Sequence, residues 1–365
     1  MRILHYNPIA DSMINQYVSM LCDSMGLECN NEMVKEAAEA LRRLRTIHYD
    51  ILHLHGCWHN SFYQVVRTAL KENTRLIYSP HGQLEPWVIA DNYWKEKLPK
   101  RLIYQQRIVS QSYAVIVQGK MEEECMAKLG WNKRVVTVKN PLITHAIQPQ
   151  EMARQIFMLY RKVMDSNQWQ LMDENMRDWL LKMIKTGITG DERWLTTEKP
   201  SSPDTLEKWR MLLCYAHQEQ IEETINKALR VFNFNVPDIE VQQIDYFLPD
   251  GYEAPQTIES VIGISFASEN ERLLATFRHL RKLVARRRLS IMHLIELDQE
   301  LRFHPCEEAA LCETLKEQGL YKLASRLMQL MKLMTGLTEG FMLMSPLDDR
   351  TTHQIRNQIN NHLKI

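Results

Sequence analysis

The sequence lacks the features that mark several special classes of protein. Its seven cysteines are scattered and form no Cys-x-x-Cys pair, which does not suit a disulfide framework or a zinc site. No apolar run approaches the roughly 18 residues of a membrane helix. The start, "MRILHYNP", has no basic region leading into a long apolar segment, as a signal peptide would. Lys+Arg and Asp+Glu both number 45, so the zero net charge does not indicate a nucleic-acid partner. We therefore expect a cytoplasmic protein with reduced thiols, no membrane span and no metal site.

What is present is the composition of an ordinary globular protein, with 45% hydrophobic and 25% charged residues in a chain of 365. The first 145 residues alternate between short apolar strands and helices. Strands are expected at residues 2–6, 50–55, 75–79, 113–117 and 134–141, and helices include 30–48, 60–72 and 120–130. Apolar strands separated by helices predict a parallel sheet covered on both faces. The predicted fold class is therefore α/β, with a doubly wound, Rossmann-like parallel sheet.

The pattern changes after about residue 146, where strand–helix alternation gives way to nearly continuous helical periodicity. The predicted organisation is a Rossmann-like domain at residues 1–146 followed by an α-helical module at 147–365. Within this module, the segment 278–290, "RHLRKLVARRRLS", is the strongest charge cluster. It could grip phosphates, an anionic membrane surface or an acidic partner. Its apolar stripe favours the simpler interpretation, a solvated basic face of a helix.

Two of the predicted strands end in His-Gly and are followed by a Trp: "DILHLHGCW" at residues 50–58 and "RLIYSPHGQLEPW" at 75–87. In doubly wound sheets, ligands bind beyond the carboxyl ends of the strands. Glycine at such a position lets the backbone come close to a ligand. The residues expected to rim one crevice at these ends are His55, Gly56, His81, Gly82, Gly119 and Asn140.

These motifs, with the "YWKEK" run after them and "VVTVKNPL" at the last strand, resemble the N-terminal half of the family 4 glycosyltransferases over about residues 1–146. Members of that family are retaining enzymes with two Rossmann domains in the glycosyltransferase B-type fold. The resemblance implies that this half holds the acceptor, and that His81 of the Ser-Pro-His-Gly turn points toward the donor sugar as the candidate catalytic residue. It implies a nucleotide sugar as donor substrate and no other cofactor.

The candidate substrate-binding residues are His55, Gly56, Trp58, Gly82, Trp87, Gly119 and Asn140. The two Trp side chains are expected either to stack on the apolar face of a sugar ring or to pack at the end of a strand. His53 is expected to be a packed structural residue.

The sequence also departs from the family pattern. The loop after the first strand, "NPIADSM", has no glycine, and residues 147–365 show neither the alternation nor the Gly-rich turns of a second, donor-binding Rossmann domain. Glu300 and Glu308 have the spacing of the family's glutamate pair, but their surroundings are helical, so we attribute the spacing to chance.

Two functions of different classes follow from these observations. One is a divergent glycosyltransferase of glycan or surface-polysaccharide synthesis, which transfers sugar from a nucleotide donor to a glycan or lipid-linked acceptor. The other is a non-catalytic binding or assembly protein, which docks a partner glycosyltransferase through its helical half. The family resemblance favours the first function, and the lack of a donor-domain pattern favours the second.

Overall fold

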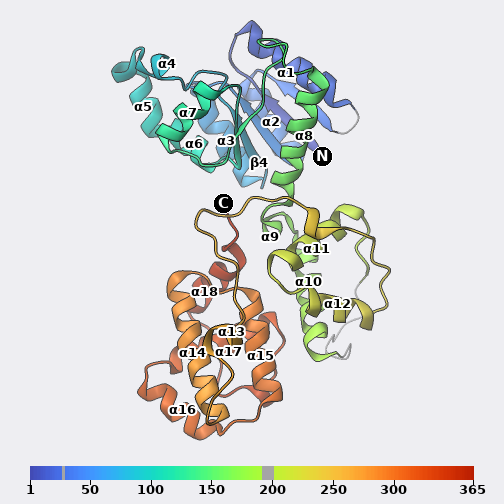
Figure 1. Cartoon of the computed structure of the whole chain (residues 1–365), viewed down its shortest axis with the longest axis vertical. Coiled ribbons are helices and arrows are strands. Elements are labelled where there is room, and N and C mark those ends of the chain that lie inside the picture. Colours follow the sequence, from blue (N-terminus) through green and yellow to red (C-terminus); the bar gives the residue numbers. More distant parts are fainter. Residues whose placement is uncertain (27–28, 191–200) are drawn as a thin grey trace. The chain divides into compact units, whose positions relative to one another are not determined.

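The computed structural model describes residues 1–26, 29–190 and 201–365 of the chain (Figure 1). The chain divides into two compact units. Unit 1 comprises Met1–Ser166 together with Asp245–Phe247 and Ile365. Unit 2 comprises Asn167–Ile244 and Leu248–Lys364.

Unit 1 is built on six parallel strands in the order β2-β1-β3-β4-β5-β6. The strands are β1 (Arg2–Tyr6), β2 (Asn30–Val34), β3 (Ile51–His55), β4 (Arg75–Ser79), β5 (Ala114–Val117) and β6 (Val135–Thr137). The helices are α1 (Ser12–Met25), α2 (Ala37–Thr46), α3 (Ser61–Lys71), α4 (Pro86–Ala90), α5 (Leu98–Lys100), α6 (Gln106–Gln111), α7 (Lys120–Leu129) and α8 (Pro149–Asp165). Two π-helical stretches, η2 (Tyr93–Lys97) and η3 (Arg101–Gln105), flank α5. This architecture confirms the predicted α/β fold class.

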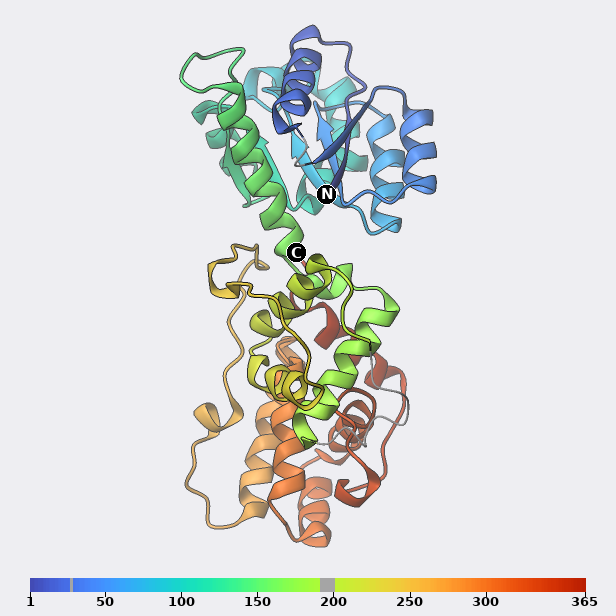
Figure 2. The same ribbon diagram turned by 90° about the vertical axis from the view of Figure 1, so that its right-hand side faces the viewer.

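Helices cover both faces of the sheet, so the central strands are buried on both sides and do not alternate between core and solvent. Helices α1 and α8 pack on one face, in a core that includes Ile3, Ile51 and Ile77 of the strands. Helices α2, α3, α6 and α7 pack on the other face, against Leu52 and Leu54. Figure 2 shows α8 and the pair α2 and α3 on opposite sides of the strands. Every residue of β3 and β4 is buried as a result.

Helix α8 belongs to unit 1, so the division of the chain lies after Ser166 and not at residue 146. The Tyr160 hydroxyl of α8 lies 2.7 Å from the Nδ1 atom of His53 on β3. The guanidinium of Arg75, fully buried at the start of β4, donates to the carbonyl of Val163. The sequence signal for the boundary was the end of strand–helix alternation. A final helix packed on the sheet carries no such signal, because its pattern continues into the helical residues that follow.

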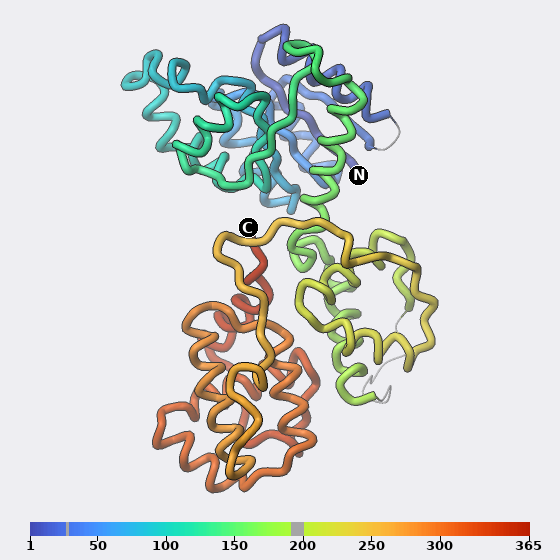
Figure 3. Tube along the Cα trace, viewed as in Figure 1, coloured from blue at the N-terminus to red at the C-terminus, as the bar shows by residue number. Residues whose placement is uncertain are grey.

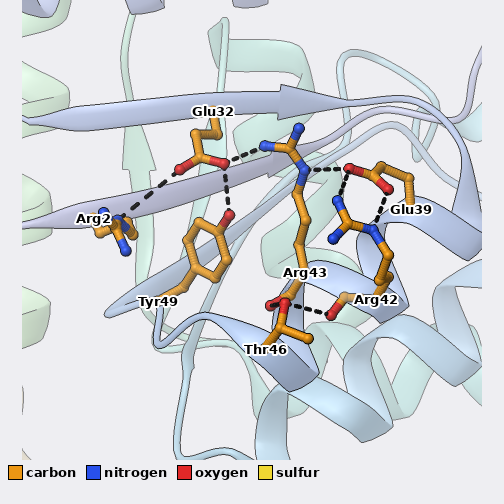
Figure 4. A network of polar contacts seen from close by, with 7 residues as sticks. All are labelled: Arg2, Glu32, Glu39, Arg42, Arg43, Thr46 and Tyr49. Carbon is orange, nitrogen blue, oxygen red and sulfur yellow. Dashed lines mark hydrogen bonds and ion pairs between the residues drawn. The ribbon is translucent and has the colours of Figure 1, made fainter.

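The expected helix at residues 30–48 is wrong in its first part. Asn30–Val34 forms the edge strand β2, paired in parallel with β1, and the helix α2 begins at Ala37. Glu32 of β2 accepts hydrogen bonds from Arg43 and from the Tyr49 hydroxyl, the latter at 2.7 Å (Figure 4). Strand pairing and this polar network, both non-local, outweigh the local helical pattern.

Unit 2 is helical and has no strand in its described residues. Its helices are α9 (Gln168–Leu171), α10 (Glu174–Thr189), α11 (Leu206–Gln218), α12 (Glu222–Val231), α13 (Ile258–Ile262), α14 (Glu269–Arg286), α15 (Ile291–Phe303), α16 (Glu308–Glu317), α17 (Tyr321–Met334) and α18 (Arg350–Asn361), with short 3-10 turns η5 (Val241–Gln243) and η6 (Glu339–Phe341). The predicted helical module is confirmed. No helix among the described residues has the length and apolarity to cross a bilayer.

The basic segment 278–290 forms the end of α14 and the turn after it. Leu280 is fully buried, whereas Arg281, Lys282 and Arg286 are exposed. The segment is therefore a helix with one buried stripe and a solvated basic face, the arrangement favoured from the sequence.

Unit 2 also contains a buried acid whose ionisation should be measurable. Burial is the main cause that raises the pKa of Glu219 to about 7, although His362 Nε2 lies 3.5 Å from its Oε1 atom. Because the folded-state pKa is raised, the stability that the neutral acid contributes is fully present below about pH 4.5 and is lost as the pH rises through about 7. Glu219→Gln should therefore stabilise unit 2 at about pH 8, by roughly 1–3 kcal/mol, and much less at about pH 5.

Thermal unfolding at these two pH values measures this effect. The exposed Glu223 of α12, replaced by Gln, serves as the control and should change little at either pH. An equal gain at both pH values in Glu219→Gln would contradict the raised pKa of Glu219.

Candidate functional site

A cluster of imidazole rings lies where the order of the strands reverses, between β1 and β3. His5 of β1 is directly opposite His53 of β3 in the parallel register. His53 and His55 are two residues apart, so both face the side of the sheet that α1 and α8 cover. All three side chains are completely buried. In doubly wound folds, this switch point is where ligands bind, beyond the carboxyl ends of the strands.

The turn after β4 adds a fourth imidazole, that of His81. The Nε2 atom of His81 lies 3.0 Å from Nδ1 of His55, and Nε2 of His55 lies 3.1 Å from Nδ1 of His5. The His55 and His81 rings are stacked, with centroids 5.3 Å apart. Three histidines from two strands and a turn thus form a continuous hydrogen-bonded row along one edge of the sheet.

Amide side chains terminate this row at both ends. On the β2 side, Oδ1 of Asn31 lies 3.1 Å from Nε2 of His5. On the other side, Nε2 of Gln118, just after β5, lies 2.6 Å from Nδ1 of His81. The Nδ2 group of Asn140 donates in turn to Oε1 of Gln118 at 3.2 Å.

Each end fixes the direction of the hydrogen bonds independently. Asn31 donates through Nδ2 to the carbonyl of Cys29, so its Oδ1 accepts from His5. Asn140 accepts the Leu142 amide on Oδ1, so its Nδ2 donates to Gln118, whose own amide then donates to His81.

Both ends lead to the same tautomer, in which each imidazole carries its proton on Nε2 and accepts on Nδ1. His81 Nδ1 is therefore a hydrogen-bond acceptor.

Burial keeps these imidazoles neutral. It lowers the pKa of His5 to about 4 and that of His81 to about 3, and it holds the pKa values of His53 and His55 well below the usual 6.5. A neutral ring has one donor and one acceptor, as the row requires. A proton added to His5, His55 or His81 would turn its acceptor nitrogen into a donor that faces the donor of the next group in the row.

His81 itself is partly buried and has a left-handed backbone conformation, with φ of 52°. Such a φ value is uncommon for a residue other than glycine and is often found at functional sites. The ring of Tyr17 from α1 lies edge-on to that of His81, with centroids 5.0 Å apart. The backbone N–H of Gly82 donates to Oε1 of Glu122 at 2.6 Å, and the backbone N–H of Gln118 donates to Oε2 of the same carboxylate at 2.9 Å.

Glu122, near the start of α7, therefore holds the turns after β4 and β5 together. It is 3% exposed, and burial raises the pKa of this carboxyl, an effect that the two backbone amides oppose.

Among the residues expected to rim the site, the structure brings together His55, His81 and Asn140. His55 contacts His81 directly, and Asn140 is linked to His81 through Gln118. Gly56, with φ of 86°, could not become alanine without a clash, because a Cβ atom there would lie 2.0 Å from Cδ1 of Ile9. Gly119 precedes α7 in an extended conformation and has open space where a Cβ atom would lie. The close contact at Gly56 is thus with the protein's own Ile9 side chain, and the expected approach of Gly56 and Gly119 to a ligand stays a prediction.

The two Trp residues differ from each other. Trp58 is 8% exposed and packs in the core of unit 1, and its indole N–H donates to the carbonyl of Gln83 at 2.9 Å. Of the two roles expected for this Trp, packing at the end of a strand and stacking on a sugar ring, the buried position of Trp58 favours packing. Trp87 lies on α4 and is 60% exposed, so its ring is available for contact.

The buried histidines also form the one group of ligand atoms in the described ranges that a metal ion could bridge. Ring nitrogens of His5, His53 and His55 lie within 4.8 Å of one another. The nitrogens of His53 already pair with the Tyr160 and Ser79 hydroxyls, both at 2.7 Å. A metal ion would have to displace these bonds and those of the row. The prediction of a site without metal did not anticipate this cluster.

Sequence reasoning missed His5, Asn31, Gln118 and Glu122, which complete the site. One signal was available for His5, which stands near the end of a predicted strand that a doubly wound order would place beside the "HLH" strand. For the other three residues, no spacing in the sequence distinguishes them from ordinary surface residues.

Unit 1 is a Rossmann-like domain with polar side chains gathered beyond the carboxyl ends of its strands. Residues 27–145 match the family model for Glycosyltransferase Family 4, so the first unit carries a glycosyltransferase family 4-like domain. The match begins before β2 and ends after β6, and it leaves His5 and all of unit 2 outside. No curated protein and no solved structure matched the chain.

Proposed function

We propose that this protein is a glycosyltransferase-like component of glycan or surface-polysaccharide synthesis. Unit 1 binds a sugar or glycan acceptor at the His81 edge of the sheet, and this chain does not by itself transfer sugar at a normal enzymatic rate. The family 4-like domain supports the general class of protein. The observation that carries the binding role is the hydrogen-bonded row, because it holds the Nδ1 acceptor of His81 at the switch point of the sheet.

Binding at this edge requires one local exchange. Gln118 occupies the His81 Nδ1 atom, and among the described residues the side chain of Gln118 has one further hydrogen bond, to Asn140. A sugar hydroxyl can replace the Gln118 amide as the donor to His81, since both are neutral donors of similar geometry. His55 and His5 behind His81 keep its tautomer fixed during the exchange.

Two observations support the lack of autonomous transfer. Retaining transfer needs the leaving diphosphate held in a fixed geometry against donor and acceptor, and the described residues of unit 2 supply no strand and no Rossmann turn for this purpose. Glu300 of α15 is paired with Arg272, and Glu308 is the first residue of a different helix, α16. This arrangement supports the interpretation of their spacing as chance.

A second candidate function, docking of a partner glycosyltransferase through unit 2, is compatible with the first. Ile264, after α13, and Phe303, at the end of α15, are large apolar residues that are strongly exposed. Exposed apolar side chains of this size are common at protein contacts. In this arrangement the partner would supply the donor site and unit 1 would supply the acceptor.

The test combines turnover and binding. Purified protein is incubated with uridine and guanosine diphosphate sugars, with and without glycan acceptors, and diphosphate release is followed. We expect no steady release, but a thermal shift with the acceptor that unit 1 recognises. The shift should disappear in His81→Asn, since Asn tolerates the left-handed backbone, and should persist in His59→Asn, which alters an exposed histidine outside the row. Steady release that His81→Asn abolishes would overturn the non-catalytic part of the proposal. A shift that both variants retain would overturn the binding site.

A further inference from the structure

A second concave surface of unit 1 lies away from the histidine row, between α3 and the helical stretch η3–α6. It is a groove of about 410 Å³. Tyr63, Leu70 and Tyr104 contribute aromatic and aliphatic surface to its lining. The residues of η3–α6 that face it recur at helical spacing (Tyr104, Arg107, Ile108 and Gln111), so the groove runs along one side of this helix.

The groove is cationic. Arg67, Lys71 and Arg107 line it, all three are exposed, and no carboxylate is among its lining residues. In the described parts of the chain none of these three cations has an ion pair, whereas other exposed cations of unit 1, such as Arg42 and Arg154, pair with a neighbouring glutamate. Three unpaired cations around one concavity give it a positive potential that attracts anions.

Large apolar side chains are exposed in the same segment. Leu102 and Ile103 of η3 are 72% and 65% exposed, directly before Tyr104 and Arg107. Trp94 of η2 is 78% exposed. Figures 1 and 3 show α4 and α5, the two helices on either side of η2, at the outer edge of unit 1. Trp and aliphatic side chains beside Lys and Arg are typical of surfaces that lie at a lipid–water interface.

We propose that the groove and the exposed apolar residues of 94–103 form a docking surface for anionic phospholipid. The phosphate of a lipid headgroup binds among Arg67, Lys71 and Arg107, and Leu102 and Ile103 enter the boundary between headgroups and acyl chains. A soluble phosphate ester would use the cations but leave the neighbouring apolar side chains in water, so the combination favours a lipid. The proposal does not depend on the function proposed for the His81 edge.

Co-sedimentation with vesicles tests the proposal. The full chain should bind phosphatidylcholine vesicles that contain phosphatidylglycerol, bind weakly to vesicles without it, and dissociate as salt rises. The triple variant Arg67→Gln/Lys71→Gln/Arg107→Gln should lose on the order of 100-fold in affinity, since each cation near an anionic surface contributes about 1 kcal/mol. The double variant Leu102→Ser/Ile103→Ser should lose at least about tenfold.

A charge-matched control comes from unit 2, where Arg281, Lys282 and Arg286 form an exposed basic face. Their triple change to Gln should leave vesicle binding unaltered. All substituted side chains are exposed, so equal melting temperatures verify folding. Failure of the wild type to bind anionic vesicles would overturn the proposal, as would loss in the control triple with retention in the groove triple. Binding of glycerol 3-phosphate as tight as that of vesicles, with no effect of Leu102→Ser/Ile103→Ser, would show a soluble-anion site and overturn it too.

Discussion

Lowering the pH from about 7 to about 4 is expected to unfold unit 1. The buried His5, His53 and His55 and the partly buried His81 all have a folded-state pKa below the usual 6.5, because burial disfavours the charged ring. A depressed pKa gives stability that is present above about pH 6.5 and is lost as the pH falls toward the folded-state value. For His5, at about 4, and His81, at about 3, the loss by pH 4 is about 3 kcal/mol each. Their sum is comparable with the whole stability of an ordinary domain, and His53 and His55 add to it.

Unit 2 should respond much less over the same range, because in unit 2 two acids with strongly raised pKa values oppose two histidines, whereas in unit 1 the raised pKa of Glu122 stands against four histidines. Burial lowers the pKa of His293 to about 4 and also lowers that of His279, so these residues lose stability in acid. Burial raises the pKa values of Glu219 and Glu296 to about 7, so these residues gain stability as the pH falls from 7 toward 4.5. The two effects act in opposite directions in one pH window.

Calorimetry at a series of pH values checks this contrast. Two transitions are expected near pH 7, of which one moves to much lower temperature by about pH 5 and the other moves little. The ordinary carboxylates of a protein titrate near pH 4, so a loss that begins near pH 6.5 distinguishes histidine from general acid unfolding. A unit 1 transition that stays constant down to pH 5 would show that these imidazoles are charged or solvated in the folded state.

The acid-sensitive row also illustrates what sequence reasoning reaches. The strand ends at His55-Gly56 and His81-Gly82 could be placed at one edge, since apolar strands that alternate with helices imply parallel strands whose carboxyl ends meet. The hydrogen bond between His55 and His81 is a finding of the structure that this arrangement permits but does not specify. The position of His5 depends on the order β2-β1-β3, which pairs strands about 50 residues apart, and no local pattern specifies a non-local register.

The same limit explains the errors at β2 and α8. Residues 30–34 carry a helical pattern that strand pairing overrides, and the contact of Tyr160 with His53 spans 107 residues. Trp58 shows a second limit, which is that the type of a residue does not say where its side chain lies. A Trp after a strand end suits both a sugar and a core, and only its packing and the bond to Gln83 decide between them. The residues of the two His-Gly strand ends could therefore be predicted as candidates. The residues that complete the site through contacts between distant parts of the chain could not.

Gly187→Ala is expected to destabilise unit 2 strongly. Gly187 lies in α10 where this helix crosses α12 at close range, and a Cβ atom built there would lie 2.0 Å from the carbonyl oxygen of Thr224 and 2.8 Å from its carbonyl carbon. No rotamer change can relieve a clash with backbone, so the two helices must separate and lose packing along their contact. Alanine would otherwise favour a helix over glycine by about 1 kcal/mol. We expect the clash to exceed this gain, with a net loss of about 3 kcal/mol and a fall in melting temperature of roughly 10 °C.

The matched control is Gly340→Ala in η6 of the same unit, where a Cβ atom would meet nothing within 4 Å. This variant should differ from the wild type by no more than about 0.5 kcal/mol. Because Gly187 and Thr224 both belong to unit 2, the transition that Gly187→Ala lowers at pH 7 is that of unit 2. The same measurement therefore shows which calorimetric transition belongs to which unit. The acid-sensitive transition, assigned to unit 1, should keep its temperature in Gly187→Ala. If Gly187→Ala lowered the acid-sensitive transition alone, the assignment of acid sensitivity to the buried histidines of unit 1 would have to be abandoned.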